Sequence, residues 1–219
     1  MASFSAYYPL LVAHEGGYCN YQLDPGGETY RGIARGQNPQ WSGWPTIDAV
    51  KRQLNLPAHV PQNQWHLLNN ALGSNAPLHA AIERFYEANF WNPLRLNEVR
   101  SQSVANQLAD HGVNAGIRRP GKMAQYLLVH EFGFALTIDG AVGPQTVHAL
   151  NAVNPALFYM SLIDMRRAFY SCRAGIAAPN ADVAQWYSFF QTQLSLKPNP
   201  AMRTFLNSWL GRTNTPFVA

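Results

Sequence analysis

Apolar residues recur at steps of three and four along most of the chain, the spacing that places side chains on one face of an α-helix. The first such run holds Phe4, Tyr8 and Leu11, and Glu15 continues it on the same face. Further runs lie within residues 65–72, 78–90, 104–108, 157–170, 183–194 and 202–210. This repeated helical spacing predicts a mainly α fold.

One stretch near the N-terminus lacks the helical spacing. Residues 18–33 contain the turn signal Asp24-Pro25-Gly26-Gly27, and residues 28–33 are typical of a short strand. We expect Gly16-Gly17 to end the opening helix, because glycine adopts the left-handed conformation that commonly closes a helix. A small β or loop region is therefore expected directly after the first helix.

The length of 219 residues fits one large domain or two small ones. A weak boundary falls at Asn92-Pro93, after the aromatic helical run, and no Gly/Ser-rich linker accompanies it. The sequence therefore predicts two regions, 1–94 and 95–219, that pack together as one body.

Charge is distributed unevenly along the chain. Residues 1–30 hold Glu15, Asp24 and Glu28 and no Lys or Arg, whereas residues 165–219 hold six basic residues and one acid. This pattern suits a carboxylate-based active site and a separate surface for an anionic polymer, although ordinary scatter accounts for it equally well. Adjacent basic residues never exceed two, which argues against a nucleic-acid partner despite the net charge of +4.

The sequence also bears on location. The first basic residue is Arg31, so no secretory signal is expected at the start of the sequence. The most apolar window, 126–136, is interrupted by His130 and Glu131, so no membrane span is expected. These features predict synthesis in the cytoplasm, with export by another system if the protein acts outside. Cys19 and Cys172 are too few for a disulfide framework, and the sequence leaves their pairing open.

Glu15 is the strongest candidate for a chemical role. A carboxyl group at the end of a helix, on its apolar face, is partly desolvated and close to the negative end of the helix dipole. Both effects favour the protonated form, which is the form a general acid needs. The alternative is a structural Glu15 that caps the helix or pairs with an arginine.

A second carboxylate follows at a suitable interval. Asp24 lies in a Pro/Gly turn that is expected to be solvated, so it should be ionised, and Thr29 follows with a hydroxyl that can hold water or a sugar hydroxyl. Two carboxyl groups in contrasting environments are what glycoside hydrolysis requires. Asp-Pro-Gly is also a common turn without chemical function.

Specific motifs extend this interpretation. Residues 14–18 read HEGGY and residues 24–33 read DPGGETYRGI. Together they resemble the N-acetylmuramidases of glycoside hydrolase family 108, and the interval between the two carboxylates is similar to that of phage-type lysozymes. The likeness continues at YEANFWNPL (86–94) and DHGVNAG (110–116). The segments DGAVGPQT (139–146), Arg166-Arg167 with Tyr170, and FLNSWLGR (205–212) resemble the peptidoglycan-binding half fused to that family.

The resemblance implies a lysozyme-like fold and a peptidoglycan hydrolase that cuts the β-1,4 bond after N-acetylmuramic acid. It makes Glu15 the catalytic acid, Asp24 the second carboxylate with Glu28 as rival, and Thr29 a residue that orients water. Tyr18, Glu28, Tyr30, Trp91 and Asn114 are expected to bind substrate, the aromatic rings by stacking on sugars and Asn114 by amide hydrogen bonds. Core packing is the competing role for the aromatic residues, and buried scaffolding for Asn114.

The resemblance implies no cofactor, and the histidine spacing suggests no metal site. The segment 139–146 also fits a structural role, with Pro144 starting a helix and Val147 and Leu150 packing inward. Cys19 and Ser208 depart from the family pattern. Bacterial peptidoglycan is the expected partner. The protein is expected to act as a phage endolysin released through a holin, or as an effector of a secretion system with an immunity protein.

Two other functions remain open from sequence. Cys19 could be the nucleophile of a wall peptidase with His14 or His111 as base, although it is not at an evident helix start that would favour its thiolate. The chain could also be a cell-wall-binding protein without catalytic activity. The choice between retention and inversion depends on the separation of the two carboxyl groups.

Overall fold

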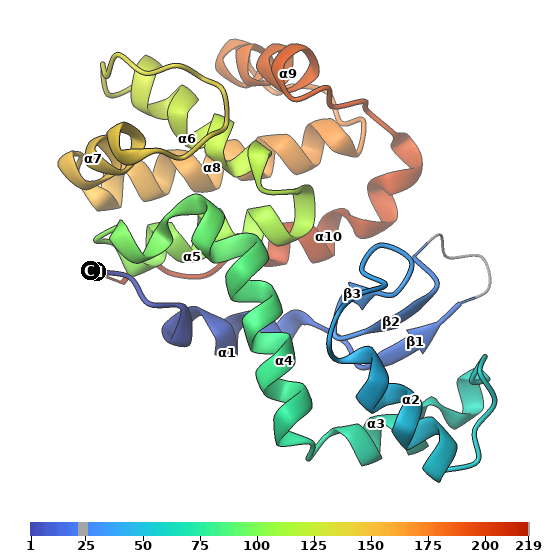
Figure 1. Cartoon of the computed structure of the whole chain (residues 1–219). Helices are drawn as coiled ribbons and strands as arrows, with labels where there is room; N and C mark the ends of the chain where they lie inside the picture. The colour runs from blue at the N-terminus through green and yellow to red at the C-terminus, as the bar shows by residue number, and fades with distance from the viewer. Residues whose placement is uncertain (22–25, 219) are drawn as a thin grey trace. The chain divides into compact units, whose positions relative to one another are not determined.

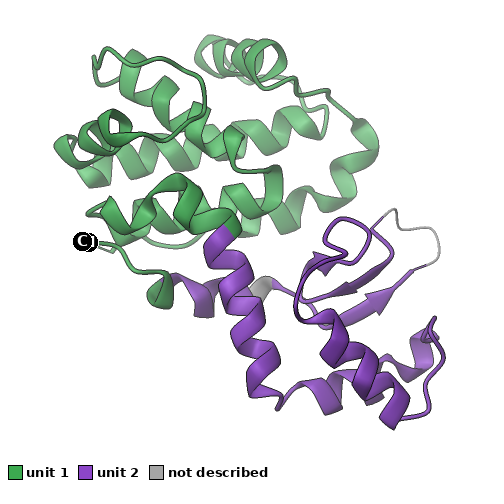
Figure 2. Ribbon diagram, viewed as in Figure 1, with its two compact units in different colours: residues 1–6, 89–219 green, residues 7–88 purple. Residues whose placement is uncertain are grey.

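The computed structural model describes residues 1–21 and 26–218, apart from the side chain of His14. Within these residues the chain is mainly helical, with one small antiparallel sheet near the N-terminus (Figure 1), which confirms the fold class expected from sequence. It divides into two compact units, residues 7–88 and residues 1–6 with 89–219 (Figure 2). The larger is called unit 1 and the smaller unit 2.

Unit 2 contains most of helix α1, the sheet and three further α-helices. Its elements are α1 (Phe4–His14), β1 (Tyr18–Asn20), β2 (Glu28–Tyr30), β3 (Ile33–Ala34), α2 (Trp44–Gln53), α3 (Trp65–Leu72) and α4 (Ala76–Tyr86), with a 3₁₀ turn at Gln62–Gln64. The strands follow the order β1-β2-β3, and both pairs are antiparallel. Helix α3 packs against β1 and α2.

The strand register determines which side chains share a face of the sheet. Tyr18 pairs with Tyr30, and Cys19 pairs with Thr29. Since successive side chains of a strand point to opposite faces, the two tyrosines share one face and Cys19 and Thr29 share the other. Tyr18 and Tyr30 are almost fully buried, so their face is the core face.

Unit 1 is built around helices α5, α6 and α8, which pack against one another, while α9 and α10 pack on α8 and α7 packs on α6. Its elements are α5 (Gln102–Ala115), α6 (Arg118–His130), α7 (Pro144–Ala152), α8 (Pro155–Arg173), α9 (Ala181–Gln193) and α10 (Arg203–Gly211), with 3₁₀ turns at Asn92–Leu94, Leu96–Glu98 and Pro200–Met202. A π-helical turn at Glu87–Trp91 begins in unit 2 and ends in unit 1. Pro144 does begin α7, and Val147 and Leu150 are buried, as the sequence predicts.

The division between the units differs from the boundary expected after residue 94. The units divide between Ala88 and Asn89, and the first six residues group with unit 1. Hydrogen bonds give the reason: Ala2 N donates to Val99 O at 2.7 Å, and Ser3 N donates to the Gln102 side chain at 2.8 Å. These bonds join the N-terminal residues to the segment that leads into α5.

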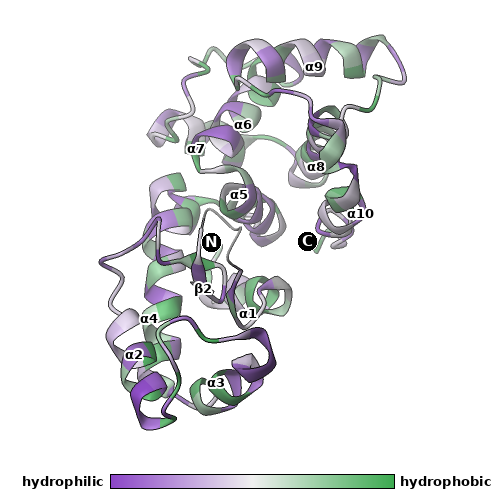
Figure 3. Cartoon of the chain, turned by 90° about the vertical axis from the view of Figure 1, so that its right-hand side faces the viewer, coloured by the Kyte–Doolittle hydropathy of each residue, from purple (hydrophilic) through white to green (hydrophobic). Residues whose placement is uncertain are grey.

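Hydrophobic and hydrophilic residues alternate along the helices, as expected for helices with one buried face (Figure 3). Among residues 1–21 and 26–218, no helix combines the length and the apolar character needed to cross a bilayer.

Candidate active site

Glu15 is the first residue after α1, in unit 2, and its side chain is half-buried. Helix α1 ends at His14 before the glycine pair, but neither glycine has a positive φ, so the left-handed cap expected from sequence is wrong. A Cβ on Gly17 would overlap the Asn69 amide, whose oxygen accepts a hydrogen bond from Tyr18 N at 2.7 Å. Glycine here lets the Asn69 side chain of α3 reach the backbone N–H of Tyr18.

The Glu15 carboxylate lies against the turn that joins β2 to β3. Tyr30 pairs with Ile33, so Arg31 and Gly32 form a two-residue hairpin turn, and both have positive φ (48° and 75°). This is the conformation of a type I′ turn, which matches the twist of the flanking strands. A Cβ on Gly32 would overlap Oε2 of Glu15. The absence of a side chain at Gly32 therefore makes room for the carboxylate.

Tyr86, near the end of α4, fixes the same turn from another direction. Its hydroxyl donates a hydrogen bond to Arg31 O at 2.7 Å, and the same hypothetical Cβ on Gly32 would lie only 2.5 Å from that hydroxyl. The tyrosine hydroxyl and the Glu15 carboxylate thus flank Gly32 together. Sequence reasoning did not assign a role to Gly32 or Tyr86, although both lie within the motifs that it singled out.

Asp24 and Thr29 are the other two residues predicted to be catalytic. Asp24 lies outside the described residues. Thr29 lies on β2, on the face opposite the core tyrosines, and its hydroxyl donates to Gly27 O at 3.1 Å. That hydrogen bond orients the Thr29 oxygen in the segment that follows Gly26.

Glu28 is the centre of an ion-pair network in unit 2. Its carboxylate binds the Lys51 ammonium and, at 2.5 Å, Nε of Arg35, whose guanidinium also binds Asp48 at 2.6 Å. Tyr18 donates a further hydrogen bond to Glu28 at 2.9 Å. Burial alone would lower the pKa of Arg35, but the two carboxylates raise it. Burial and then the Glu28 charge raise the pKa of Tyr18.

The geometry of this network gives Glu28 a clear structural function. Lys51 is buried, so the carboxylate compensates a cation that has little access to water. Both carboxylate oxygens of Glu28 are occupied: one ties β2 to Lys51 of α2, and the other binds Arg35, the residue after β3.

The three aromatic residues expected to stack on sugars lie in the cores. Tyr18, Tyr30 and Trp91 are 2%, 1% and 0% exposed. Trp91 donates its indole N–H to Asn97 at 2.7 Å and packs edge-on against Phe4. The structure therefore gives these rings packing roles and presents none of their faces to a sugar.

Asn114 belongs to unit 1, near the C-terminal end of α5. It is exposed, and its amide nitrogen donates to Asp110 O, one helical turn earlier, at 2.8 Å. Its amide oxygen remains the group that would bind an N-acetyl N–H.

Several of the motif residues of unit 1 meet in one buried cluster. Asp110 accepts hydrogen bonds from Arg166 at 2.5 Å and from Arg212 at 2.8 Å, and Arg166 also binds Gln107 and Tyr170. Burial alone would lower the pKa of Arg166, but Tyr170 and Asp110 raise it. The motif residues at 110–116, 166–170 and 205–212 therefore meet in one buried ion-pair cluster of unit 1.

His111 and Cys19 were the elements of an alternative peptidase site. His111 is fully buried against Phe169 and Tyr170, and burial, with the charges of Arg166 and Arg119, holds its pKa well below the ordinary value. A base in that environment cannot reach a substrate at the surface. The side chain of His14 lies outside the described residues. In the described part of the chain, no three His, Cys, Asp or Glu residues are grouped to hold a metal.

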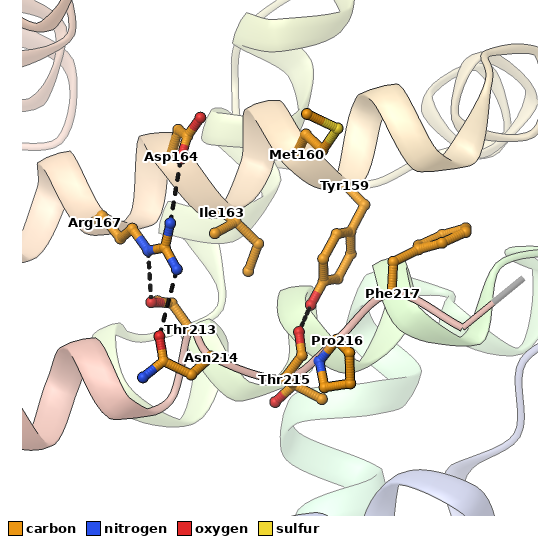
Figure 4. Close-up of a pocket in the computed structure, with 10 residues that line it drawn as sticks. All are labelled: Tyr159, Met160, Ile163, Asp164, Arg167, Thr213, Asn214, Thr215, Pro216 and Phe217. Carbon is orange, nitrogen blue, oxygen red and sulfur yellow. Dashed lines mark hydrogen bonds and ion pairs between the residues drawn. The ribbon is translucent and has the colours of Figure 1, made fainter.

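A separate cavity of about 430 Å³ lies in unit 1 between α8 and the C-terminal segment 213–217 (Figure 4). Arg167 reaches across to Thr213 and Asn214, and Tyr159 donates to Thr215 O. These bonds hold the segment along α8. Neither Glu15 nor Thr29 lines this cavity.

Comparison with known proteins identifies a family that part of the chain matches. Residues 8–116 match the family described as Glycosyl hydrolase 108. Among solved structures, that of Brucella abortus SagA is similar over 97% of this chain and 96% of that chain, with 18% sequence identity and a TM-score of 0.48. No curated protein matches the chain.

Proposed function

The chain belongs to glycosyl hydrolase family 108, and from that premise we propose that it is an N-acetylmuramidase of bacterial peptidoglycan. The bond cleaved is the β-1,4 link between N-acetylmuramic acid and N-acetylglucosamine. The observation that carries the proposal is the position of Glu15: a carboxyl group at the end of α1, held against the Arg31–Gly32 turn where glycine leaves room for it.

Glu15 acts as the general acid in this proposal. It protonates the glycosidic oxygen as the bond to the anomeric carbon breaks, and the sugar acquires oxocarbenium character. The Tyr86 hydroxyl and the type I′ turn keep the carboxylate in place, so the proton is delivered from a fixed position. Glu15 is thus the residue on which the reaction depends most.

Asp24 is the second carboxylate in the proposal, stabilising the developing positive charge or directing water to the anomeric carbon, with Thr29 orienting that water. The rival, Glu28, has both of its oxygens bound to Lys51 and Arg35. A carboxylate neutralised by two cations is poorly suited to stabilise a third positive charge. This argument favours Asp24 over Glu28.

Product analysis of purified peptidoglycan tests the proposal. Wild type and Glu15→Gln are incubated with the polymer, new ends are reduced with borohydride, and the products are identified by mass spectrometry. Reduced muramic acid ends from wild type, and none from Glu15→Gln, are expected. Glu131→Gln is the matched control because it makes the same chemical change at an exposed position in unit 1.

The other outcomes contradict specific parts of the proposal. Reduced glucosamine ends would support a glycosidase, but they would show that it cleaves a different glycosidic bond from the one proposed. Peptide fragments without new reducing ends would contradict the glycosidase proposal and favour a wall peptidase with Cys19 as its nucleophile. Binding without any product would leave a wall-binding protein, and full activity of Glu15→Gln would remove Glu15 from the mechanism.

We propose in addition that the enzyme reaches the wall either through a holin, as an endolysin, or through a secretion system, as an antibacterial effector. The support is that the substrate lies outside the cytoplasmic membrane. Producing the protein alone, with a holin, or with a cleavable export signal in a test bacterium separates delivery from catalysis. Lysis is expected only in the last two cases, and lysis by the protein alone would contradict the proposal. An immunity protein that inhibits the purified enzyme is expected only for an effector.

A further inference from the structure

The basic residues of the C-terminal region are largely occupied within unit 1. Arg166 and Arg212 bind Asp110, and Arg203 donates to the carbonyl oxygens of Ala174 and Gly175. These side chains stabilise the fold. A positive surface for an anionic polymer therefore has to be found in other residues.

A cavity of about 410 Å³ at the start of α6 supplies such residues. Arg118, Arg119 and Lys122 line it from the first turns of α6, and Leu194 and Ser195 line it from the segment after α9. The three cations occur within five residues of sequence, in the segment RRPGK. All of these residues belong to unit 1.

The three cations are held by backbone carbonyl oxygens. Arg118 donates to Asp139 O at 3.2 Å, Arg119 to Ala115 O at 2.5 Å, and Lys122 to Gln193 O at 2.8 Å. Within residues 1–21 and 26–218, none of the three forms an ion pair with a carboxylate. Carbonyl oxygens orient the three side chains, but a neutral carbonyl group does not cancel a full positive charge.

Neighbouring groups strengthen the positive field. Burial and the charge of Arg173 lower the pKa of Arg119, which means that another cation already lies close to it. Helix α6 begins without a capping side chain, so its first-turn N–H groups add partial positive charge. The nearby carboxylate of Asp139 accepts hydrogen bonds from Ala141 N at 2.8 Å and from Gln125 at 3.0 Å. These bonds lower its pKa most, and the charge of Arg118 contributes less.

Close packing fixes this arrangement. A Cβ on Gly121 would overlap Gly140 O, and a Cβ on Gly140 would lie 2.7 Å from Arg118 O. The start of α6 and the loop at 139–141 therefore meet backbone to backbone. The cations consequently project from a rigid base, which lowers the entropic cost of binding an anion.

We propose that this cavity binds carboxylate groups of the peptide stems of peptidoglycan. The planar guanidinium groups match the geometry of a carboxylate. The cavity volume of about 410 Å³ is larger than a single small anion needs, since one water molecule occupies about 30 Å³. Ile117 and Leu194 add apolar wall for the aliphatic parts of a peptide. The inference rests on the proposed function for its substrate, but it concerns binding and not cleavage.

A binding assay with a soluble peptide stem tests the proposal without hydrolysis. Affinity is measured by calorimetry for the wild type, for Arg118→Gln/Lys122→Gln, and for Arg52→Gln/Arg100→Gln. The last variant is the matched control because it removes the same charge from exposed arginines outside the cavity. Binding is expected to weaken at least ten-fold in the first variant and less than two-fold in the control, and added salt should weaken wild-type binding.

Two further arms keep the result interpretable. Arg118→Lys/Lys122→Arg retains both charges and is expected to restore most of the affinity, which separates loss of charge from loss of folding. A peptide stem with amidated carboxylates is expected to bind at least ten-fold more weakly, and inorganic phosphate is expected not to displace the free peptide at equal concentration. Equal affinity for the amidated peptide, equal competition by phosphate, or an equal loss in the control variant would overturn the proposal.

The wall-hydrolysis assay distinguishes this inference from the proposed function. If wild type produces new reducing ends but the peptide does not bind at the cavity, the inference alone fails. If the peptide binds as expected but no glycosidic bond is cut, the muramidase proposal fails and the binding site stands.

Discussion

The carboxylate of Asp110 binds the guanidinium of Arg166 at 2.5 Å, across 56 residues of sequence, and the Arg166 side chain is fully buried. This pair joins α5 to α8 in the core of unit 1. Arg212 adds a second cation on the other carboxylate oxygen and so connects the end of α10 to the same point. The cluster therefore ties three helices of unit 1 together through a single carboxylate.

Asp110→Asn is expected to destabilise the protein by about 3–5 kcal/mol, because it leaves Arg166 buried without a counter-charge. The free energy of unfolding in urea measures the effect. Asp164→Asn is the control because it makes the same chemical change at an exposed carboxylate, whose contact with Arg167 is 3.5 Å long. Exposed pairs of that kind contribute about 0–1 kcal/mol. A loss below about 1 kcal/mol for Asp110→Asn would contradict the structural role.

Glu28 and Glu15 are expected to respond differently to the same substitution. Glu28→Gln should lower the free energy of unfolding by about 2–4 kcal/mol, because Lys51 and Arg35 lose their shared partner. Below its lowered melting temperature, this variant should still cleave peptidoglycan. Glu15→Gln should instead retain stability and lose activity.

The measurement combines thermal unfolding with hydrolysis rates for both variants. A folded but inactive Glu28→Gln would make Glu28 the second catalytic carboxylate in place of Asp24. The double variant Glu28→Gln/Lys51→Met should recover part of the lost stability, since it removes the unpaired ammonium together with its partner.

Gly32→Ala is expected to reduce hydrolysis by about 10- to 100-fold, because the added methyl group overlaps the Glu15 carboxylate and displaces it. Gly133→Ala is the control: its φ of 74° nearly equals the 75° of Gly32, but no atom lies within 4 Å of its added Cβ. Both variants should lose about 1–2 kcal/mol of stability from backbone strain. Equal activities of the two variants would show that the carboxylate does not depend on this turn.

Helical spacing predicted most of the helices, but it missed α2 and α6. The first turn of α6 contains Pro120 and Gly121, residues that usually mark a loop. Pro120 is tolerated because the first turn of a helix lacks a partner for its N–H. Gly121 is required because Gly140 O occupies the space of a side chain. Both residues signal a tertiary contact that periodicity cannot detect.

The candidate site was predictable in part. Glu15 follows from the position of a carboxyl group at a helix end, but its neighbours Gly32 and Tyr86 meet it only through tertiary packing. The strand expected at 28–33 is a hairpin that turns at Arg31, whose φ of 48° is uncommon for a residue other than glycine. Charge counting also failed to separate buried arginines, such as Arg166, from the partly or fully exposed cations of α6.

Stability is expected to depend on pH through His111. Burial, with the charges of Arg166 and Arg119, holds the pKa of His111 well below the ordinary value of about 6.5. Below that pH the unfolded chain binds a proton at this imidazole and the folded protein does not. The free energy of unfolding should therefore fall by about 1.4 kcal/mol per pH unit below pH 6.5, until the pKa of the folded state is reached.

Urea unfolding at several pH values between about 5 and 7.5 measures this slope, which other groups also influence. His111→Gln should be less dependent on pH than the wild type by about 1.4 kcal/mol per unit, because it cannot accept the proton in either state. His59→Gln controls for the loss of one imidazole at an exposed position. If His111→Gln retains the full wild-type slope, the imidazole is protonated in the folded protein, and the Arg166 cluster then tolerates a further cation beside it.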